Sequence, residues 1–294
     1  MPALDGILLV DKPEGYSSAE VVRVLKKARH IKKIGHLGTL DPFASGLLPI
    51  CIGAGSKLSQ FLTAAPKSYE GTLQLGVETD TLDCTGTITR TVPVPPDWTM
   101  TLQEMERRFD GEYWQTPPMY SALKRNGVPL YKLARRGIEI KREPRKVHLA
   151  HLTLTQGASD TIHFSVSCSK GTYIRVLAAD LAATLNCVAH VTRLRRTAFG
   201  SFSIDQAVPL SLVEDPEIEP SFPLLSLVQA TQCYRTFSLP AKAVALLQQG
   251  QQWVLQELPT VSDPTETVRI LGPNKELVAF AGQQEGFWRL VRVF

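Results

Sequence analysis

The alternation of apolar and polar residues indicates a chain built largely from strands. Residues 147–155 (VHLAHLTLT) and 161–168 (TIHFSVSC) alternate apolar and polar side chains, which is typical of half-buried strands. Residues 6–10 (GILLV) are a continuous apolar run that predicts another strand. Further strands are expected in YEGTLQLGVETD (69–80), GTITRTVPV (86–94) and HVTRLRRTAFGSFSI (190–204).

Helices are predicted between these strands. Ser17 and Glu20 form a capping box, S-S-A-E, which predicts a helix from there to about His30. Thr101 and Glu104 repeat the motif ahead of LQEMERRFDG. A short helix is expected in KLSQFLTAA (57–65), and a passage from strand into helix in GTYIRVLAADLAATLN (171–186). The mixture predicts an α+β fold around a largely antiparallel mixed sheet.

A second, smaller unit is predicted near the C-terminus. Residues 214–223 (EDPEIEPSFP) are acidic and contain three prolines, which favours a connector. From about Thr236 the pattern is one short helix followed by strands, about the size of a small barrel. We therefore expect a large domain over residues 1–235 and a small β-barrel domain over residues 236–294.

The composition narrows the class of protein. No run of 18 or more apolar residues occurs, so no membrane span is expected. No cationic segment precedes the first apolar run, which argues against a signal peptide. The five cysteines are odd in number and scattered, which favours reduced thiols in a cytoplasmic protein.

Basic charge is concentrated in two segments. Residues 21–33 contain six Lys and Arg and no acid. Residues 120–146 contain nine Lys and Arg against two glutamates, and include Tyr120 and Tyr131. Since the whole chain carries only +4, the remainder is net acidic. Basic groups neutralise phosphates and aromatic rings stack on exposed bases, so the pattern favours a polyanionic partner such as RNA. Solvated basic surfaces are the alternative.

The sequence offers no metal or nucleotide motif. His148 and His151 form H-x-x-H, but on a predicted strand, where side chains three apart point to opposite faces. Neither a phosphate-binding G-x-x-x-x-G-K-[ST] loop nor a dinucleotide fingerprint occurs. We therefore expect neither metal nor cofactor.

One carboxylate stands out, in residues 35–50 (GHLGTLDPFASGLLPI). Asp41 is the only charged acid in a stretch of glycines, prolines and apolar residues. Asp before Pro is ordinary turn chemistry, and on the residues alone a turn is the simpler interpretation. The other interpretation is a catalytic aspartate in an apolar pocket, which would need a cation such as Arg175 to stay ionised.

Five segments, in this order, resemble the TruB family of bacterial tRNA pseudouridine synthases. They are GHLGTLDPFASGLLPI, KSYEGTLQLGVETDTLD, QTPPMYSALKRNGVPLYKLARRG, SKGTYIRVLAADL and HVTRLRRTAFGSF. The resemblance runs from about residue 5 to residue 208, and the C-terminal part is similar to the PUA-type RNA-binding domain of that family. It implies a pseudouridine synthase fold. It also implies an enzyme that isomerises uridine 55 in the T loop of tRNA, without metal or cofactor.

The resemblance also implies roles for individual residues. Asp41 matches the nucleophilic aspartate, Arg175 its arginine partner, and Tyr69 the tyrosine that stacks on the target base. Four further positions match the substrate-binding region: His36, which enters the space left by the flipped nucleotide; Leu194, an apolar wall; Lys12, which with Pro13 supports the active-site loop; and Tyr173. Residues 117–146 match a mobile loop that folds over RNA, with Lys124, Arg125, Lys132, Arg135 and Arg136 as its RNA-binding cations.

Two departures and two rival functions bear on this resemblance. Ala182 and Asn186 stand where the family has glycines, and Asn can adopt the left-handed conformation that a helix end requires. An RNA-binding or tRNA-folding protein acting independently of catalysis is one alternative function. A hydrolase is the other, although it would usually need a second acid near Asp41. We expect a cytoplasmic monomer acting on the T arm of tRNA, with no obligate protein partner.

Overall fold

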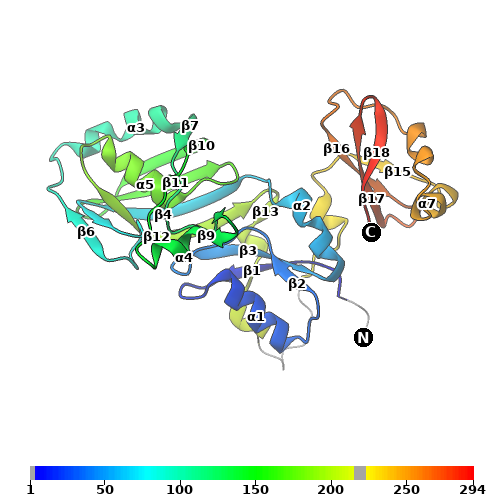
Figure 1. The fold of residues 1–294 in the computed structure, drawn as a ribbon, viewed down its shortest axis with the longest axis horizontal. Coiled ribbons are helices and arrows are strands. Elements are labelled where there is room, and N and C mark those ends of the chain that lie inside the picture. The colour runs from blue at the N-terminus through cyan, green and yellow to red at the C-terminus, as the bar shows by residue number, and fades with distance from the viewer. Residues whose placement is uncertain (1–3, 215–222) are drawn as a thin grey trace.

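The computed structural model describes residues 4–214 and 223–294, and its main feature is a ten-stranded sheet (Figure 1). The strands are β1 (Gly6–Lys12), β2 (Ile34–His36), β3 (Ser45–Ile52), β4 (Lys67–Leu75), β7 (Gly111–Gln115), β10 (Arg145–Gln156), β11 (Thr161–Cys168), β12 (Ala189–Phe199), β13 (Phe202–Ser203) and β14 (Val208–Pro209). Their order is β14-β1-β3-β12-β4-β11-β10-β7, with β2 paired to β3 and β13 to β12. Only β1–β14 and β3–β12 pair in parallel, which confirms the predicted α+β fold with a largely antiparallel mixed sheet.

The helices are short and lie between the strands. They are α1 (Ser18–Ala28), α2 (Ser59–Leu62), α3 (Leu102–Phe109), α4 (Leu130–Ala134), α5 (Ile174–Ala183), α6 (Leu210–Glu214) and α7 (Ala241–Gln248). Two small hairpins project from the large sheet: β5 (Val77–Thr79) with β6 (Ile88–Thr91), and β8 (Lys124–Arg125) with β9 (Val128–Pro129). Within the described ranges, no helix has the length and apolar character that a membrane crossing requires.

Strand β1 is buried on both faces, which explains its uninterrupted apolar run. Leu8 and Val10 belong to the main core, together with the inner faces of α1 and α5. Ile7 and Leu9 point the other way, into a second cluster that contains residues of the C-terminal unit. A strand covered on both faces has no polar face to alternate with, so the sequence reads as continuous apolar residues.

The two predicted capping boxes have different outcomes. At α1 the Ser17 hydroxyl accepts a hydrogen bond from the backbone N–H of Glu20, and the Glu20 carboxylate accepts one from the Ser17 N–H, which confirms the box. At α3 the prediction is wrong. The Thr101 hydroxyl donates instead to the carbonyl oxygen of Trp98, because residues 98–101 already form a 3-10 turn that leads into the helix.

We expect Ser17→Ala to lower the free energy of unfolding by about 1 kcal/mol, because the backbone N–H of Glu20 loses the hydroxyl that caps it. Thr101→Ala, which removes no helix cap, should cost less. Chemical denaturation of both variants measures the difference. Equal losses would show that the capping box at α1 contributes nothing beyond an ordinary hydroxyl contact.

Helix α5 begins without the strand predicted before it. Residues 169–173 form a turn, and Tyr173 takes the N-cap position of the helix. At the other end, Asn186 has φ +53°, the left-handed conformation expected where the family has a glycine. Ala182 is completely buried within α5. Both departures are therefore accommodated by the local backbone.

The C-terminal unit is a separate four-stranded sheet, at the upper right of Figure 1. Its strands are β15 (Thr236–Ser238), β16 (Thr267–Leu271), β17 (Leu277–Gln284) and β18 (Phe287–Val293), and α7 belongs to its core. The order β15-β16-β17-β18 leaves β15 and β18 at opposite edges. In the described part of the chain these four strands therefore form an open sheet. Their pairing does not close the barrel that the sequence predicted.

An apolar cluster joins the two sheets. Phe280 of β17 stacks on Phe61 of α2, with ring centroids 3.9 Å apart, and the Tyr234 hydroxyl donates to the carbonyl oxygen of Phe61 at 2.8 Å. The Lys57 ammonium donates to the carbonyl oxygen of Val293 at 3.2 Å. These contacts bury the small sheet against α2. Most of the predicted connector, residues 215–222, lies outside the described residues.

Candidate active site

Residues 35–50 form the end of β2, a loop over residues 37–44 and most of β3, and the loop is held between these two strands. The N–H of Leu37 donates to the carbonyl oxygen of Pro49, and the N–H of Ala44 to that of Asp41, so Asp41 does start a turn. Gly46 has φ +103°, and a Cβ there would lie 2.3 Å from the carbonyl oxygen of Arg196 on β12. Only glycine fits this conformation and this close approach. The loop is therefore held rigidly against the middle of the sheet.

Asp41 is paired with Arg175, which lies in the first turn of α5. The Nε of Arg175 lies 2.9 Å from Oδ2 of Asp41. The arginine side chain is only 5% exposed, whereas that of Asp41 is 38% exposed. The carboxylate thus contacts a buried guanidinium and still has exposed surface that a ligand can reach. The sequence suggested this pair as one possibility, and the fold brings the two residues together.

The remaining donors of Arg175 bind two loops. Its Nη1 donates to the carbonyl oxygen of Thr81 at 2.7 Å, and its Nη2 to that of Tyr120 at 2.9 Å. All three guanidinium nitrogens therefore have an acceptor. A guanidinium held through all three of its nitrogens is fixed in orientation, and it presents Nε to Asp41 in one geometry.

A second carboxylate, Asp83, was missed by the sequence reasoning. Its Oδ2 lies 3.6 Å from Nη1 of Arg175, and its side chain is 6% exposed. Its Oδ1 accepts hydrogen bonds from the hydroxyls of Thr81 (2.8 Å) and Thr85 (2.6 Å) and from the N–H of Thr85 (3.0 Å). The run T-L-D-C-T carried a signal, since closely spaced threonines often bind a carboxylate between them. Both oxygens of Asp83 therefore already have partners, Oδ1 in the two threonines and Oδ2 in Arg175.

The environment of Asp41 shifts its pKa in opposing directions. Burial raises the pKa of Asp41, the Arg175 guanidinium opposes that rise, and the neighbouring Asp83 carboxylate adds to it. Lys12 also favours the ionised form. The outcome is a carboxylate with a raised pKa whose negative charge depends on a single direct cationic partner. Such a group suits nucleophilic or base chemistry.

Lys12, at the end of β1, binds backbone carbonyl groups of the segment after β1 and of the Asp41 loop. It is completely buried, and its ammonium donates to the carbonyl oxygens of Pro13 (2.9 Å), Tyr16 (2.7 Å) and Pro42 (3.4 Å). Burial lowers the pKa of Lys12 to about 8, and Asp41 opposes that shift. The contact of Lys12 with the carbonyl oxygen of Pro42 ties β1 to the residue that follows Asp41.

Tyr69 and Leu194 lie on adjacent central strands. Tyr69 of β4 is opposite Arg196 of β12, and Leu194, two residues earlier on β12, is buried in the main core against which Tyr69 packs. Burial raises the pKa of the Tyr69 hydroxyl, and Arg196 opposes the rise. The hydroxyl is therefore neutral at physiological pH.

Arg196 is a further residue that the sequence reasoning did not single out. It is 1% exposed, and it donates through Nε to the carbonyl oxygen of Leu47 at 2.7 Å and through Nη2 to that of Gly38 at 3.1 Å. It therefore fixes both ends of the Asp41 loop. Burial and the charge of Arg196 lower the pKa of His36.

His36 and Tyr173 border the site without pairing with Asp41. His36 is the last residue of β2, and its buried Nδ1 has no hydrogen-bond partner within the described ranges. Tyr173 precedes α5, and its backbone N–H and carbonyl both bind the Gln115 side-chain amide, at 2.8 and 3.1 Å. Burial raises the pKa of Tyr173. His36 directly precedes the Asp41 loop and Tyr173 lies two residues before Arg175, and their roles toward a substrate stay predictions.

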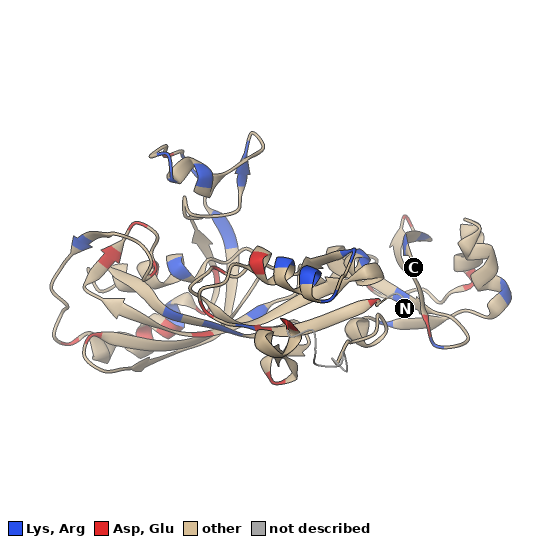
Figure 2. Ribbon diagram, turned by 90° about the horizontal axis from the view of Figure 1, so that it is seen from below, with Lys and Arg blue, Asp and Glu red and all other residues tan. Residues whose placement is uncertain are grey.

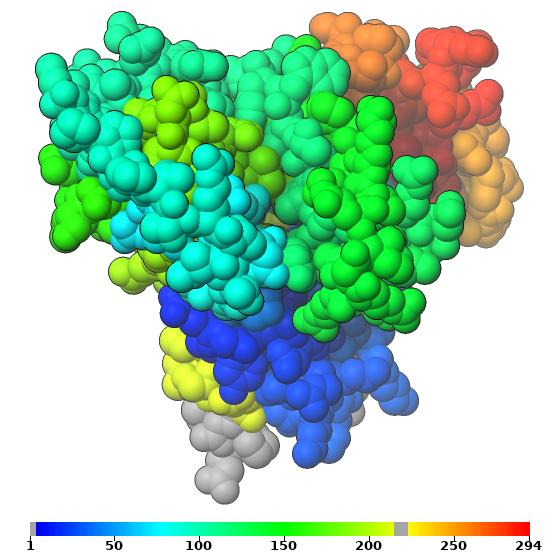
Figure 3. All heavy atoms as spheres, turned by 60° about the vertical axis from the view of Figure 1, so that its left-hand side comes forward, coloured from blue at the N-terminus to red at the C-terminus, as the bar shows by residue number. Residues whose placement is uncertain are grey.

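Residues 117–144 form an arm that stands out from the sheet (Figure 2), and residues 145 and 146, the last two of the predicted mobile loop, begin β10. The arm contains the β8–β9 hairpin and α4, and its predicted RNA-binding cations are all exposed: Lys124, Arg125, Lys132, Arg135 and Arg136. None of the five is in an ion pair among the residues that the structure describes. Figure 3 shows the arm, in green, beside the cyan segment around the β5–β6 hairpin and above the blue N-terminal part.

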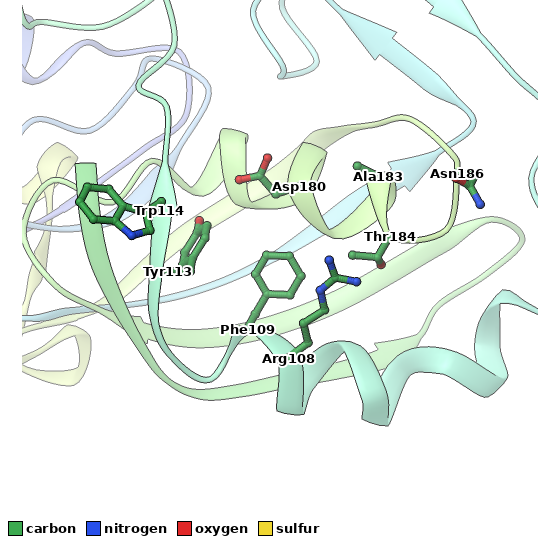
Figure 4. A pocket seen from close by; sticks show the side chains of 8 residues that line it. All are labelled: Arg108, Phe109, Tyr113, Trp114, Asp180, Ala183, Thr184 and Asn186. Atoms are coloured by element: carbon green, nitrogen blue, oxygen red, sulfur yellow. The ribbon is translucent and has the colours of Figure 1, made fainter. Parts of the chain in front are cut away.

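A cavity of about 600 Å³ lies elsewhere, among α3, β7 and α5 (Figure 4). Trp114, Tyr113 and Asp180 line it, and none of the residues around Asp41 does. Burial raises the pKa of Asp180 to about 6. The site at Asp41 is therefore separate from this cavity.

Comparison with known proteins identifies the class. Residues 26–174 match the N-terminal domain model of the TruB family pseudouridylate synthases, and residues 175–220 match a tRNA pseudouridylate synthase B C-terminal domain. The fold is also that of a chain in the crystal structure of a Cbf5-Nop10-Gar1 complex, with a TM-score of 0.74 and 25% identity over 99% of this chain and 84% of that one. Fold and family model together define a pseudouridylate synthase, an isomerase.

Two relatives narrow this to a family. A tRNA pseudouridine synthase B of Opitutus terrae is 47% identical over 74% of this chain and 91% of its own length. One of Burkholderia pseudomallei is 42% identical over 97% of this chain and 95% of its own length. The chain belongs to the TruB family of pseudouridylate synthases.

Proposed function

We propose that this protein converts uridine 55 in the T loop of tRNA to pseudouridine. The observation that carries the proposal is the Asp41–Arg175 pair at 2.9 Å, in which the arginine is buried and the aspartate is partly exposed. The relatives whose names give tRNA as their substrate support the choice of RNA. The exposed, unpaired cations of the arm support a polyanionic substrate.

The reaction is an internal rearrangement that depends on the Asp41 carboxylate. Attack of Asp41 on the ribose, attack on the base and promotion of a glycal intermediate are the three possible routes, and each returns the free carboxylate at the end. The bond between N1 of the uracil and C1′ of the ribose breaks, the base turns, and a bond from C5 to C1′ replaces it. C5 loses a proton and N1 gains one, so nothing is oxidised or reduced. The neutral nucleoside keeps its composition, so the reaction consumes no co-substrate, and the family resemblance implies neither metal nor cofactor.

Reaching the glycosidic bond requires the uridine to leave its stack, at a cost of a few kcal/mol. We assign Tyr69 to stacking on the extruded base and Leu194 to the apolar wall beside it. His36 fills the space that the base leaves, and Tyr173 contacts the substrate near Arg175. Lys12 holds the Asp41 loop through the carbonyl oxygen of Pro42.

We assign binding of the tRNA to surfaces outside the candidate active site. The five arm cations contact phosphates of the T arm. The C-terminal unit, residues 236–294, acts as a PUA-like RNA contact, separate from a catalytic domain of residues 1–235. The proposed active form is a cytoplasmic monomer that needs no partner protein.

The test is conversion of a T-arm RNA hairpin by the purified protein. Pseudouridine should appear at the position of uridine 55, and a hairpin with cytidine there should remain unmodified. Mass spectrometry of nuclease fragments after selective chemical labelling of pseudouridine locates the product. Absence of product in the hairpin and in full-length tRNA would overturn the proposed substrate.

The pH dependence of the reaction should reveal the charges around Asp41. A raised pKa of Asp41 means that activity is lost as the pH falls through that pKa, earlier than for an exposed aspartate. Asp83→Asn removes a negative charge near Asp41. It also removes the carboxylate that competes with Asp41 for the charge of Arg175, and both effects lower the pKa of Asp41. We therefore expect the acid limb of the single-turnover rate to move to lower pH. A limb that stayed in place or moved up would contradict this assignment.

A further inference from the structure

The root of the arm makes direct contact with the catalytic arginine. Nη2 of Arg175 donates to the backbone carbonyl of Tyr120 at 2.9 Å, although 55 residues separate the two in sequence. The same guanidinium donates to the carbonyl of Thr81 at 2.7 Å and to Asp41 at 2.9 Å. Arg175 therefore joins three segments: the Asp41 loop, the loop after β5, and the arm.

A second contact joins two of these segments without Arg175. The Tyr120 hydroxyl donates to Oδ2 of Asp80 at 3.3 Å. The other oxygen of Asp80 accepts from the N–H of Thr87 at 2.8 Å, which fixes the carboxylate in the β5–β6 turn. Burial and the Asp80 carboxylate raise the pKa of Tyr120, so the hydroxyl keeps its proton and remains a donor.

The arm continues this chain of contacts outward. The N–H of Tyr131 donates to the carbonyl of Ser121 at 3.1 Å, and the N–H of Leu130 donates to that of Leu123 at 2.7 Å. These bonds join the start of α4, which carries Lys132, to the residues directly after Tyr120. A displacement of α4 by bound RNA would therefore pull on Tyr120.

From this geometry we propose that Tyr120 is a positioning residue for catalysis: its hydroxyl, held by Asp80, keeps its own carbonyl on Arg175 and thereby orients Arg175 toward Asp41. The inference rests on the proposed function. It gives the Tyr120 side chain a role other than stacking on RNA bases. It also links the arm that binds RNA to the group that performs the chemistry.

Tyr120→Phe tests this with the loss of a single hydroxyl. At saturating T-arm hairpin, we expect the single-turnover rate to fall about three- to tenfold, the range of one modest hydrogen bond. The Kd for the hairpin should stay within about twofold. Tyr234→Phe is the matched control, since it removes a hydroxyl with a shorter hydrogen bond, 2.8 Å, at the contact between the two sheets. Its single-turnover rate should equal that of the wild type.

Two further readouts separate positioning from a general structural effect. Asp80→Ala should also slow the rate. Relative to the wild type, the fold loss of the double variant should be smaller than the product of the two single fold losses. Asp41 is faced by Arg175, Asp83 and Lys12. A less firmly held Arg175 raises the pKa of Asp41, so the acid limb of the Tyr120→Phe rate should move to higher pH.

The outcomes are distinct. An inactive wild type would count against the proposed function, not against this inference alone. An unchanged rate in Tyr120→Phe, or effects of Tyr120→Phe and Asp80→Ala that multiply independently, would overturn the positioning role. A weaker Kd with an unchanged saturated rate would show instead that Tyr120 is an ordinary RNA contact.

Discussion

Asp41→Asn is expected to abolish pseudouridine formation, with a loss of at least about 10³-fold, while tRNA binding stays within a few-fold. The amide has nearly the shape of the carboxylate but is a far poorer nucleophile and base. Arg175 keeps its bonds to the Thr81 and Tyr120 carbonyls and its contact with Asp83, so the guanidinium stays in place. It nevertheless loses its closest charge partner, and we expect some loss of thermal stability.

The measurement is single-turnover release of tritium from 5-tritiated uridine in a T-arm hairpin, because C5 loses its hydrogen as the new bond forms. Circular dichroism establishes that the variant is folded. Asp11→Asn is the control, since Asp11 is likewise a partly exposed aspartate paired with an arginine, Arg195, at 2.7 Å. Its rate should match that of the wild type.

Asp41→Glu should fail as well. The extra methylene displaces the carboxylate by more than about 1 Å, and reaction geometry tolerates little error of that kind. The loop cannot move to compensate, because Arg196 binds the carbonyls of Gly38 and Leu47 on either side of Asp41. Tritium release near the wild-type rate by a folded Asp41→Asn protein would contradict a catalytic role for Asp41. Its only role would then be in the turn.

The sequence predicted most of the sheet because its strands carry strong local signals. β10 and β11 alternate as half-buried strands do, and β1 is the continuous apolar run of a strand covered on both faces. The capping box at Ser17 is a local motif, and it was predicted correctly. The same motif at Thr101 was misleading, because the preceding residues adopt a 3-10 turn that the pattern does not specify.

The active site was less accessible to local reasoning. Asp41 and Arg175 are 134 residues apart, and only the fold, through β3, β12 and α5, brings them to 2.9 Å. Without the family resemblance, an aspartate before a proline is as well explained by a turn, and the structure shows that it is one. Asp83 and Arg196 were missed because each acts through burial and backbone contacts that residue spacing does not reveal.

The second large effect concerns the arm. Replacing Lys124, Arg125, Lys132, Arg135 and Arg136 together with Ala should weaken tRNA binding by roughly 10²-fold at low salt. These side chains are exposed and lie outside the ion pairs of the described residues, so their charge is available to phosphates. Their removal should leave the packing of the large sheet intact.

The salt dependence of binding distinguishes phosphate contacts from general electrostatic attraction. Each lost phosphate contact should reduce the slope of log K against log salt by about 0.7 to 0.9. A control variant replaces Arg90, Arg107 and Arg108, exposed arginines on β6 and α3. It also lowers the net charge, but its slope should equal that of the wild type. If the arm variant kept the wild-type slope, its cations would act only by raising the local potential, and the RNA would have to be bound by another surface.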